Sequence, residues 1–541
     1  MTSTKTVIKT SVARLRKYSG STFIPIATAS VLVVGAAWLA LAPIAQAKPP
    51  PSEDRGNGNS AAENVDALNL STSGSNNTAH GWFSLFSNTT GSSNTADGFQ
   101  ALYSNTQGID NAAYGYQALY SNSGDGFLGS YNTAIGSQAL YSNTSGLFQT
   151  AVGYQALFHS NSGGNTAIGV QALYNSQGGF NAAVGEQALF SNTTGDGNVA
   201  VGDEALYGNT TGELNVAIGE LALAGNTTGS ANIAIGSNAL FYNRTGDSNT
   251  AIGVVALWRN TTGSSNTGVG ESALHGGDDG ITGNGNTAGG AFALSGDTTG
   301  NNNTASGYNA LFNNTTGDRN TGIGYEALYN NSSGVDNTAV GPFALFNNTG
   351  ANNAAFGAAA GVNVATASNV ICIGTGGRDV NNSCFIGHIR GVTTANADAV
   401  PVLIDSQGQL GTASSSRRFK KEIQPMDKAS EAILALSPVT FHYKSDTTNT
   451  AQFGLIAEEV AEVNADLVVR DADGGIYTVR YDAVNAMLLN EFLKEHRKVQ
   501  DLEKGMAAVT AQLKEQASQI QKVSAHLEMS KPATNVVLNN P

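Results

Sequence analysis

The chain has 541 residues, of which 13% are charged and 65 are glycine, and its formal net charge is −14. The charged fraction is about half the usual level of roughly 25%, which excludes a charge-rich disordered chain and an ordinary long coiled coil. The lack of a Gly-X-Y period excludes collagen, and the presence of only two cysteines excludes a disulfide scaffold. The acidic balance argues against nucleic acid as a partner, because phosphate binding needs a basic surface.

The N-terminus has the order of an export signal. Basic residues between Lys5 and Lys17 precede an apolar run, residues 26–42, and the small-x-small sequence Ala45-Gln46-Ala47. This order predicts a signal peptide, residues 1–47, cleaved after Ala47, so that the protein is secreted or held at the cell surface. The apolar run is longer than the ~7–15 residues usual in signal peptides, so an uncleaved membrane anchor at residues 26–42 is the alternative. Residues 48–75 are expected to form a linker.

Residues 76–361 repeat one short sequence, Asn-Thr-Ala-x-Gly-x-x-Ala-Leu. Its glycine recurs every 17 residues from Gly81 to Gly357, apart from three steps of 16 and two insertions, near Gly124 and Gly276. Helical repeats need about 33 residues or more, so this unit predicts a β rung in which Asn-Thr-Thr-Gly segments make the turns. One rung cannot bury its apolar side alone, and neighbouring rungs are expected to stack into a rod.

The recurring Ala-Leu-Tyr/Phe stripe bears on association. A rod of single rungs has a thin interior, and this stripe is more apolar than a solvent-facing strand should be. We therefore expect the stripe to face other chains in a parallel bundle, with a homotrimer preferred and a lone β-solenoid as the alternative. The repeats resemble the head repeats of trimeric autotransporter adhesins, which implies left-handed parallel β-rolls in a three-chain assembly. The expected fold class is mainly β, a fibrous β-roll or β-solenoid with rungs of about 17 residues.

Residues 362–412 are expected to form a β joint after the rod. The sequence predicts two shortened strands around Cys372 and Cys384 and then a hairpin within residues 402–411. Alternation places the two sulfurs on opposite faces, which favours buried free thiols over a disulfide, although an exported chain would permit one. Histidines and carboxylates do not recur in the rod with ligand spacing, so we expect no metal site, no cofactor and no glycan-cleaving enzyme there.

A different domain begins near Arg417, because 15 of the 27 lysines and arginines lie from that residue onward. A basic segment within residues 415–423 precedes a helical pattern at 429–436, strands at 439–443 and 477–481, and between these strands the segment 453–460. This order resembles the C-terminal intramolecular chaperone of phage tailspikes and endosialidases, a self-cleaving peptidase domain. The resemblance predicts a small α/β chaperone domain at residues 413–484.

The resemblance also implies a function and a site. Three such domains would assemble, set the register of the β-stalk chains and then release themselves by cutting at a serine. The family's Ser-Lys dyad, five residues apart, maps onto Ser415 and Lys420, with the cut between Ser414 and Ser415. A lysine accepts the serine proton only if burial or cationic neighbours lower its pKa from about 10.4. Relatives often have Asp after the serine, where this chain has Ser416. The choice among Ser414, Ser415 and Ser416 therefore stays open, as does a module that assembles without cutting.

Residues 485–527 are expected to form a coiled coil, and residues 528–541 a disordered tail. Apolar residues recur there at alternating steps of three and four, which is typical of helix association, whereas a single amphipathic helix packed on its own domain is the alternative. These seam residues are Leu488, Phe492, Val499, Leu502, Met506, Val509, Leu513, Ile520, Val523 and Leu527. Together these features predict an exported trimeric fibre, adhesin-like, with a cell surface or a glycan as its target.

Overall fold

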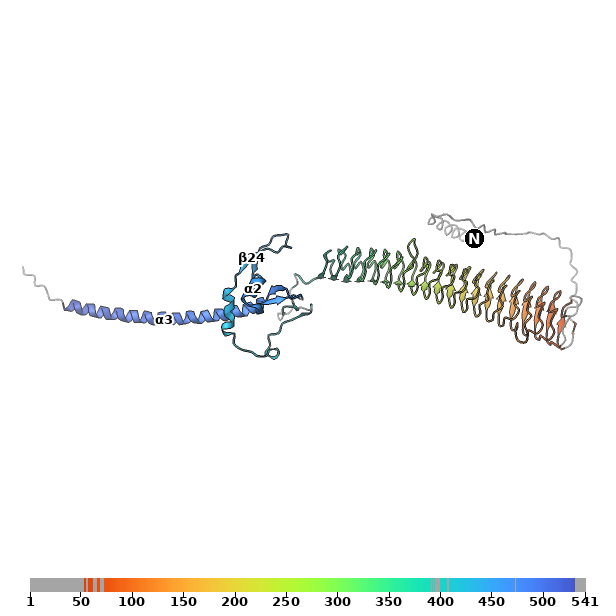
Figure 1. Cartoon of the computed structure of the whole chain (residues 1–541), viewed down its shortest axis with the longest axis horizontal. Helices are drawn as coiled ribbons and strands as arrows, with labels where there is room; N and C mark the ends of the chain where they lie inside the picture. Colours follow the sequence, from red (N-terminus) through yellow and green to blue (C-terminus); the bar gives the residue numbers. More distant parts are fainter. Residues whose placement is uncertain are drawn as a thin grey trace, which may run out of the picture. The chain divides into compact units, whose positions relative to one another are not determined.

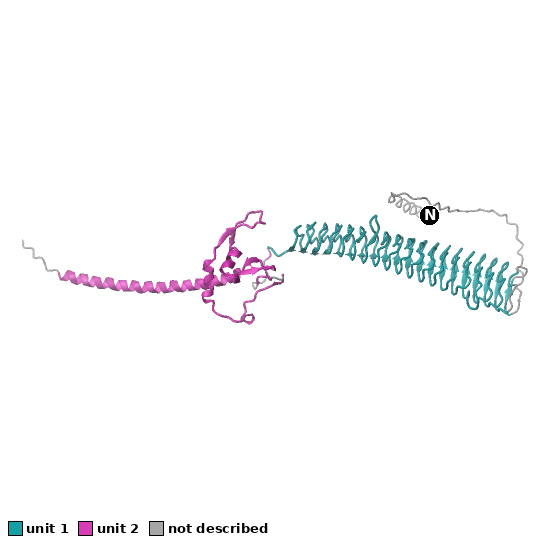
Figure 2. Cartoon of the chain, in the orientation of Figure 1, with its two compact units in different colours: residues 1–391 teal, residues 392–541 magenta. Residues whose placement is uncertain are grey.

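The computed structural model describes residues 53–54, 57–61, 66–68, 73–390, 392, 394, 399–405, 408–471 and 473–530 (Figure 1). The predicted signal peptide or anchor lies outside the described residues, as do most of the predicted linker and residues 531–541 of the predicted tail. Two compact units, residues 1–391 and 392–541, are coloured separately in Figure 2. Within the described residues no helix has the length and apolar character needed to cross a bilayer.

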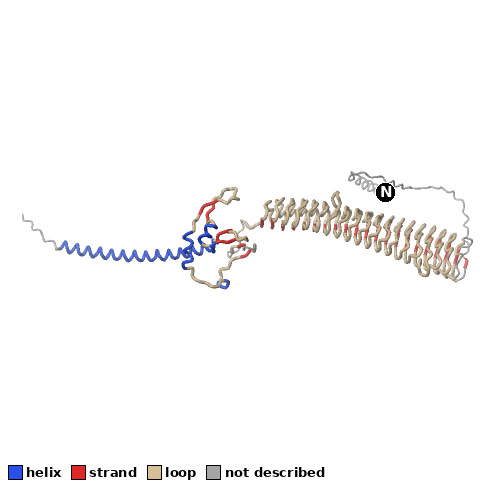
Figure 3. Tube along the Cα trace, in the orientation of Figure 1, coloured by secondary structure: helices blue, strands red, loops and turns tan. Residues whose placement is uncertain are grey.

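The first unit is a β-solenoid, as the repeat predicted. Between Thr78 and Phe356, a stretch that is described throughout, seventeen three-residue strands each pair in parallel with the strand of the next rung, and Figure 3 shows them stacked along one side of the coil. These strands are β3 (Thr78–His80), β4 (Thr95–Asp97), β5 (Ala112–Tyr114), β6 (Thr133–Ile135), β7 (Thr150–Val152), β8 (Thr166–Ile168), β9 (Ala182–Val184), β10 (Val199–Val201), β11 (Val216–Ile218), β12 (Ile233–Ile235), β13 (Thr250–Ile252), β14 (Thr267–Val269), β15 (Thr287–Gly289), β16 (Thr304–Ser306), β17 (Thr321–Ile323), β18 (Thr338–Val340) and β19 (Ala354–Phe356).

The interior of the coil holds the alanine and leucine of each repeat. In one rung the middle strand residue Ala200 and the following Ala205 and Leu206 are all 0% exposed, and the same positions are buried along the rod. The expectation that the Ala-Leu stripe faces other chains is therefore wrong for both residues. A turn after each strand carries them into the same buried cluster as the strand's own alanine, so a single chain covers them.

Asparagines fill the rest of the interior and form ladders between rungs. The side-chain Oδ1 of Asn198 accepts hydrogen bonds from the backbone N and from Nδ2 of Asn215, at 2.9 and 3.1 Å, and Nδ2 of Asn215 also donates to the carbonyl of Gly229 at 2.9 Å. A second ladder runs through the turns, where Asn209 Nδ2 donates to Asn192 Oδ1 at 2.8 Å. Buried polar groups are stable only when paired, and these ladders pair them in nearly every rung.

The glycine that marks the repeat is required by close backbone contact. Gly202 has φ of +141°, and a Cβ there would lie 2.5 Å from the carbonyl oxygen of Gly219 in the next rung. A side chain at this position would force the two rungs apart. The spacing of the glycines therefore records the spacing of the rungs.

Short strands flank the repeats within the first unit. Strands β1 (Glu53–Asp54) and β2 (Ser60–Ala61) precede them, and β20 (Val370–Ile373) and β21 (Ser383–Ile386) follow. In the register of β20 and β21, Cys372 pairs with Phe385 and Cys384 pairs with Ile371. Both cysteines are free, as expected, but only Cys372 is buried. The expectation that both thiols are buried is wrong for Cys384, whose side of the alternating strand is exposed.

The second unit is a small region of strands and helices that ends in one long helix, in agreement with the expected fold class. Its described elements are the hairpins β22–β23 (Leu403–Ile404, Leu410–Gly411), β24–β25 (Val439–Phe441, Gln452–Gly454) and β26–β27 (Val468–Arg470, Ile476–Val479), the 3₁₀ helices η1 (Arg417–Phe419), η2 (Asp427–Ala435) and η3 (Ala465–Leu467), and the α-helices α2 (Ala457–Val463) and α3 (Tyr481–Met529). Its core is thin, with only Val460, Leu467, Val468 and Val479 as buried apolar residues among those described.

Candidate functional site

The predicted cleavage segment is an exposed stretch between the β22–β23 hairpin and η1. Residues 412–416 have no regular secondary structure, and every residue from 411 to 425 is exposed. The turn of η1 is held by its backbone, because Phe419 N donates to the carbonyl of Ser416 at 3.0 Å and Lys420 N donates to that of Arg417 at 3.1 Å. A segment this open is accessible to bond cleavage.

Ser415 precedes η1 in the chain and Lys420 follows it directly. Among the described residues the structure records no hydrogen bond between the two side chains, whereas the neighbouring Ser414 Oγ accepts from Ser416 N at 3.3 Å. The guanidinium of Arg418 lies over the ring of Phe419, 4.6 Å from its centroid. A single chain therefore carries both predicted catalytic groups close together in sequence, with no hydrogen bond recorded between them. The Ser-Lys dyad stays a prediction.

A buried polar cluster that the sequence did not reveal joins η2 to α3. Ser430 is 0% exposed, and its Oγ donates to Glu491 Oε1 and accepts from Asn490 Nδ2 at 2.7 Å. Lys494 Nζ donates to the same Glu491 oxygen at 2.7 Å and lies 3.4 Å from Ser430 Oγ. The one local signal is the i, i+3 spacing of Glu491 and Lys494, because the partner serine lies about sixty residues earlier in the sequence.

This cluster positions the long helix and is not a second cleavage site. The hydrogen bond from Lys494 to Glu491, and then that from Ser430, lowers the pKa of the Glu491 carboxyl. The carboxylate is therefore the stable form, and the ammonium of Lys494 is held as its ion-pair partner. Ser430 is buried, and the peptide group that its hydroxyl contacts is the carbonyl of Asp427, at 3.1 Å. Within the described residues, no three His, Cys, Asp or Glu side chains gather as metal ligands would.

An apolar groove opens beside this core. It is bordered by side chains of η2, the β24–β25 hairpin and the start of α3, namely Ile433, Leu436, Pro438, Val439, Phe453, Leu455, Tyr481, Val484 and Leu488. Phe453 is 81% exposed and Leu488 is 57% exposed. A region with so few buried residues therefore leaves large apolar side chains in water.

Helix α3 extends the same apolar surface. It runs for 49 residues, and all ten seam residues predicted from the sequence, from Leu488 to Leu527, are at least 47% exposed. The helix packs mainly against η2 near its own N-terminal end. The alternative in which the whole helix packs on its own domain is therefore not what the structure shows.

Residues 415–469 match the family model described as chaperone of endosialidase. The C-terminal unit contains a chaperone-of-endosialidase domain. This agrees with the predicted resemblance, and the family is one of serine-type autoproteolytic chaperone domains. The matched part of the chaperone domain begins at Ser415, the predicted nucleophile, and follows the repeat region. Comparison with curated proteins and with solved structures returned no match.

Proposed function

We propose that the chain is an exported, tail-fibre-like homotrimer, whose C-terminal chaperone domain brings three chains together and then cuts itself from the rod. The main support for a trimer is the row of seam residues on α3, which no other part of the described chain covers. Its ten apolar side chains stand exposed along one long helix. Burying each contributes about 1.5–3 kcal/mol, and a seam with this spacing is buried by winding helices together.

The outer face of the solenoid sheet supports the same assembly. The third residue of most strands is an exposed apolar side chain, such as Val201 at 38%, Ile218 at 40% and Ile252 at 40%. Because the strands pair in register, these side chains form one stripe along the rod. This stripe replaces the Ala-Leu stripe as the rod surface that other copies would cover. A lone solenoid would leave it in water, which disfavours that alternative.

The proposed reaction uses one serine, one lysine and one water. Lys420 Nζ, as the neutral amine, takes the proton of Ser415 Oγ while the oxygen attacks the carbonyl carbon of Ser414. The new C–O bond forms, the C–N bond to Ser415 breaks, and the freed amine of Ser415 gains a proton. Water then hydrolyses the ester that joins Ser414 to the Ser415 side chain. The products are a carboxylate at Ser414 and a free serine at the start of the released domain.

Assembly is the step that we propose brings the two groups together. In the single chain Ser415 and Lys420 are exposed and share no described hydrogen bond, so the lysine is not placed to accept the serine proton. Contact with a second chaperone domain would desolvate the segment and favour the neutral amine. Cleavage would then follow trimer formation. The second candidate, a trimerisation domain that is retained uncut, is favoured by Ser416 at the position where the family often has Asp.

The test is the mass of the chain after folding. A fragment of residues 415–541 should appear on a denaturing gel, with Ser415 as its first residue by N-terminal sequencing. Ser415→Ala and Lys420→Met should each reduce cleavage at least a hundredfold and leave the trimer intact by light scattering, while Lys421→Met serves as the matched control and should cut normally. A fragment that persists in Ser415→Ala would refute this nucleophile, and an intact wild-type trimer would establish the uncut module.

A further inference from the structure

The repeats provide an internal comparison that separates residues needed for the coil from residues that it does not need. Most rungs carry serine, glycine or asparagine two positions after the buried leucine, such as Ser191, Gly208 or Gly225. One earlier rung carries His159 there, and two consecutive rungs carry Tyr242 and Arg259. Because most rungs form without a large side chain at this position, neither Tyr242 nor Arg259 is explained by folding of the coil.

A third departure lies two residues beyond Tyr242. Neighbouring rungs place Thr210, Thr227 and Thr261 at this position. The hydroxyl of Thr210 donates to the backbone carbonyl of Thr227 at 2.8 Å. The hydroxyl of Thr227 donates to the backbone carbonyl of Arg244, also at 2.8 Å. Arg244 has no hydroxyl with which to continue this row. The rung therefore gives up a hydrogen bond to present a guanidinium group.

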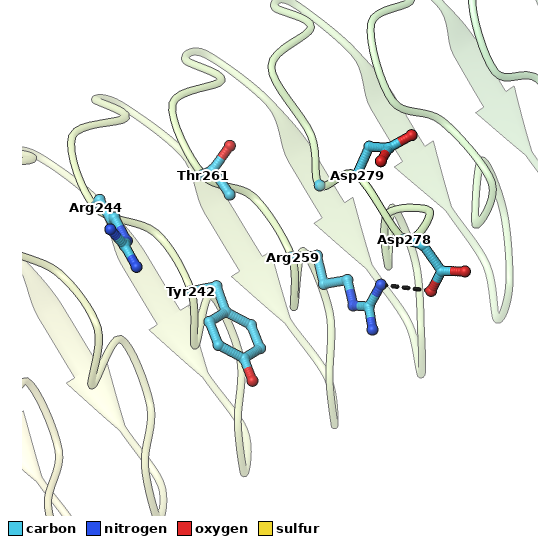
Figure 4. A pocket seen from close by; sticks show the side chains of 7 residues that line it. Tyr242, Arg244, Arg259, Thr261, Asp278 and Asp279 are labelled. Carbon is cyan, nitrogen blue, oxygen red and sulfur yellow. Dashed lines mark hydrogen bonds and ion pairs between the residues drawn. The ribbon is translucent and has the colours of Figure 1, made fainter. Parts of the chain in front are cut away.

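These departures meet in one recess beside the only insertion between Gly136 and Gly357, all of which the structure describes. The recess is lined by Tyr242, Arg244, Arg259, Thr261, Asp278, Asp279 and Gly280, and Figure 4 shows Arg244, Tyr242 and Arg259 on neighbouring turns of the coil with the two aspartates on the inserted loop. The rod has only three arginines and no lysine from residue 56 to residue 377, and two of those arginines are here.

Two of the charged side chains in the recess form an ion pair, and the other two have no recorded side-chain partner within the described part of the chain. Arg259 donates to Asp278 at 2.7 Å and lies over the ring of Trp258, 5.2 Å from its centroid. Among the described residues the structure records no hydrogen bond or ion pair for the Arg244 guanidinium or for the Asp279 carboxylate. The recess therefore offers a free planar cation and a free acceptor.

The recess also presents an aromatic face. One row of aromatic side chains stacks nearly parallel from Tyr103 to Tyr207, as in the pair Tyr103 and Tyr120 with 5° between their planes. Tyr242 lies outside that row, at 65° to the ring of Trp258, and is 42% exposed. Its ring is thus available to a ligand, with the apolar body and polar tip typical of tyrosine at binding surfaces.

We propose that this recess binds an acidic saccharide of the uronic-acid class. A guanidinium pairs with a carboxylate through two parallel hydrogen bonds, which assigns Arg244 to the ligand carboxylate. The Tyr242 ring takes the apolar C–H face of the pyranose, and Asp279 accepts hydrogen bonds from its hydroxyl groups. The saccharide supplies all three features on one ring, whereas an acidic peptide lacks the hydroxyl donors for Asp279. The inference does not depend on self-cleavage.

The test is calorimetric titration of the full chain with a tetrasaccharide of alternating glucuronic acid and N-acetylglucosamine. Wild type should bind it at least tenfold more tightly than the same tetrasaccharide with its carboxyl groups reduced to alcohols. Arg244→Thr restores the residue of the neighbouring rungs, so it should fold normally and lose at least tenfold in affinity. Arg319→Asn removes an equal charge elsewhere on the rod and should bind as wild type does.

Four results would overturn the proposal. They are the absence of wild-type binding, equal binding of the reduced saccharide, full affinity in Arg244→Thr, or equally tight binding of an acidic peptide such as tetraglutamate. Circular dichroism of Arg244→Thr and Arg319→Asn confirms that each variant keeps the solenoid. None of these results changes the expected release of residues 415–541, so the two proposals fail separately.

Discussion

At the scale of single residues, the asparagine ladders explain how so thin a rod stays ordered. Each amide has both a donor and an acceptor, so it can pair with the rung before it and the rung after it. Asp297 interrupts one ladder, because its side chain lacks the amide NH₂ donor of asparagine. Its Oδ1 accepts from Asn314 Nδ2 at 3.2 Å, while its buried Oδ2 has no partner among the described residues. Burial raises the pKa of Asp297 to about 8.

The raised pKa makes a prediction about pH. The folded rod holds the Asp297 proton that the unfolded chain loses above its ordinary pKa of 3.8. This carboxyl therefore leaves stability intact below about pH 4 and reduces it as the pH rises from about 4 to about 8, by up to about 1.4 kcal/mol per unit. Asp297→Asn should unfold at higher urea concentration than wild type, with a difference that grows between pH 5 and pH 8.

The converse variant is the control for this pH effect. Asn209→Asp places a carboxyl group at the equivalent turn position of a regular rung, next to Asn192 and Asn226. It should lower the urea midpoint at pH 8 more than at pH 5, because a buried carboxyl group at this position, like that of Asp297, destabilises the rod once it loses its proton. A difference between Asp297→Asn and wild type that does not change with pH would contradict the assignment.

At the scale of elements, the junction of η2 and α3 fixes the direction in which the long helix leaves the chaperone domain. Ser430 connects the two elements through Glu491 and Asn490, and Lys494 completes the pairing. A hydrogen-bonded cluster around a buried serine holds a single geometry, because each group left without a partner carries a desolvation cost. The seam of α3 is thereby presented at a defined angle for assembly.

Removing the central hydroxyl should loosen this junction. Ser430→Ala leaves buried acceptors and donors without one partner, which costs about 1–3 kcal/mol. We expect a lower thermal midpoint for the chaperone domain and faster amide hydrogen exchange at the N-terminal end of α3. Ser437→Ala alters an exposed serine in the same region and should behave as wild type. Equal exchange in both variants would show that the cluster does not hold the helix.

At the scale of the whole molecule, the proposed order of events is assembly at the C-terminal end followed by pairing of the rods. Rungs with nearly identical sequences can pair out of register, because a shift by one rung replaces each residue with a similar one. Joining chains through α3 sets one register before the rods meet. Slow, non-local pairing of β chains is a common cause of misfolding, and a helical nucleus avoids it.

Disrupting the seam should therefore separate the chains. The double variant Leu502→Glu and Val509→Glu places charges at two positions that the proposed coiled coil buries. Light scattering should report a mass near that of one chain, 55.4 kDa before processing, and release of residues 415–541 should stop. Ala511→Glu lies away from the seam and should stay trimeric. A trimer that survives the double variant would place the main contacts elsewhere.

The sequence by itself determined the period of the rungs, the parallel stacking and the long C-terminal helix. The reason is that the glycine spacing fixes which residues lie above one another, and the steps of three and four fix one face of a helix. Only the tertiary structure decided which way side chains point. Leu206 is buried because its backbone adopts φ of +55°, a conformation that leucine rarely takes alone and that stacked neighbours hold in place.

The same division applies to the candidate sites. The resemblance to the chaperone family places Ser415 and Lys420 in one basic turn, and their pairing stays a prediction. The Ser430 cluster and the recess at Arg244 could not be found from the sequence, because each joins groups from separate segments whose distance depends on how the turns fold. The insertion and the departures from the repeat were visible in the sequence, but only the coil brings Tyr242, Arg244 and Asp279 to one surface.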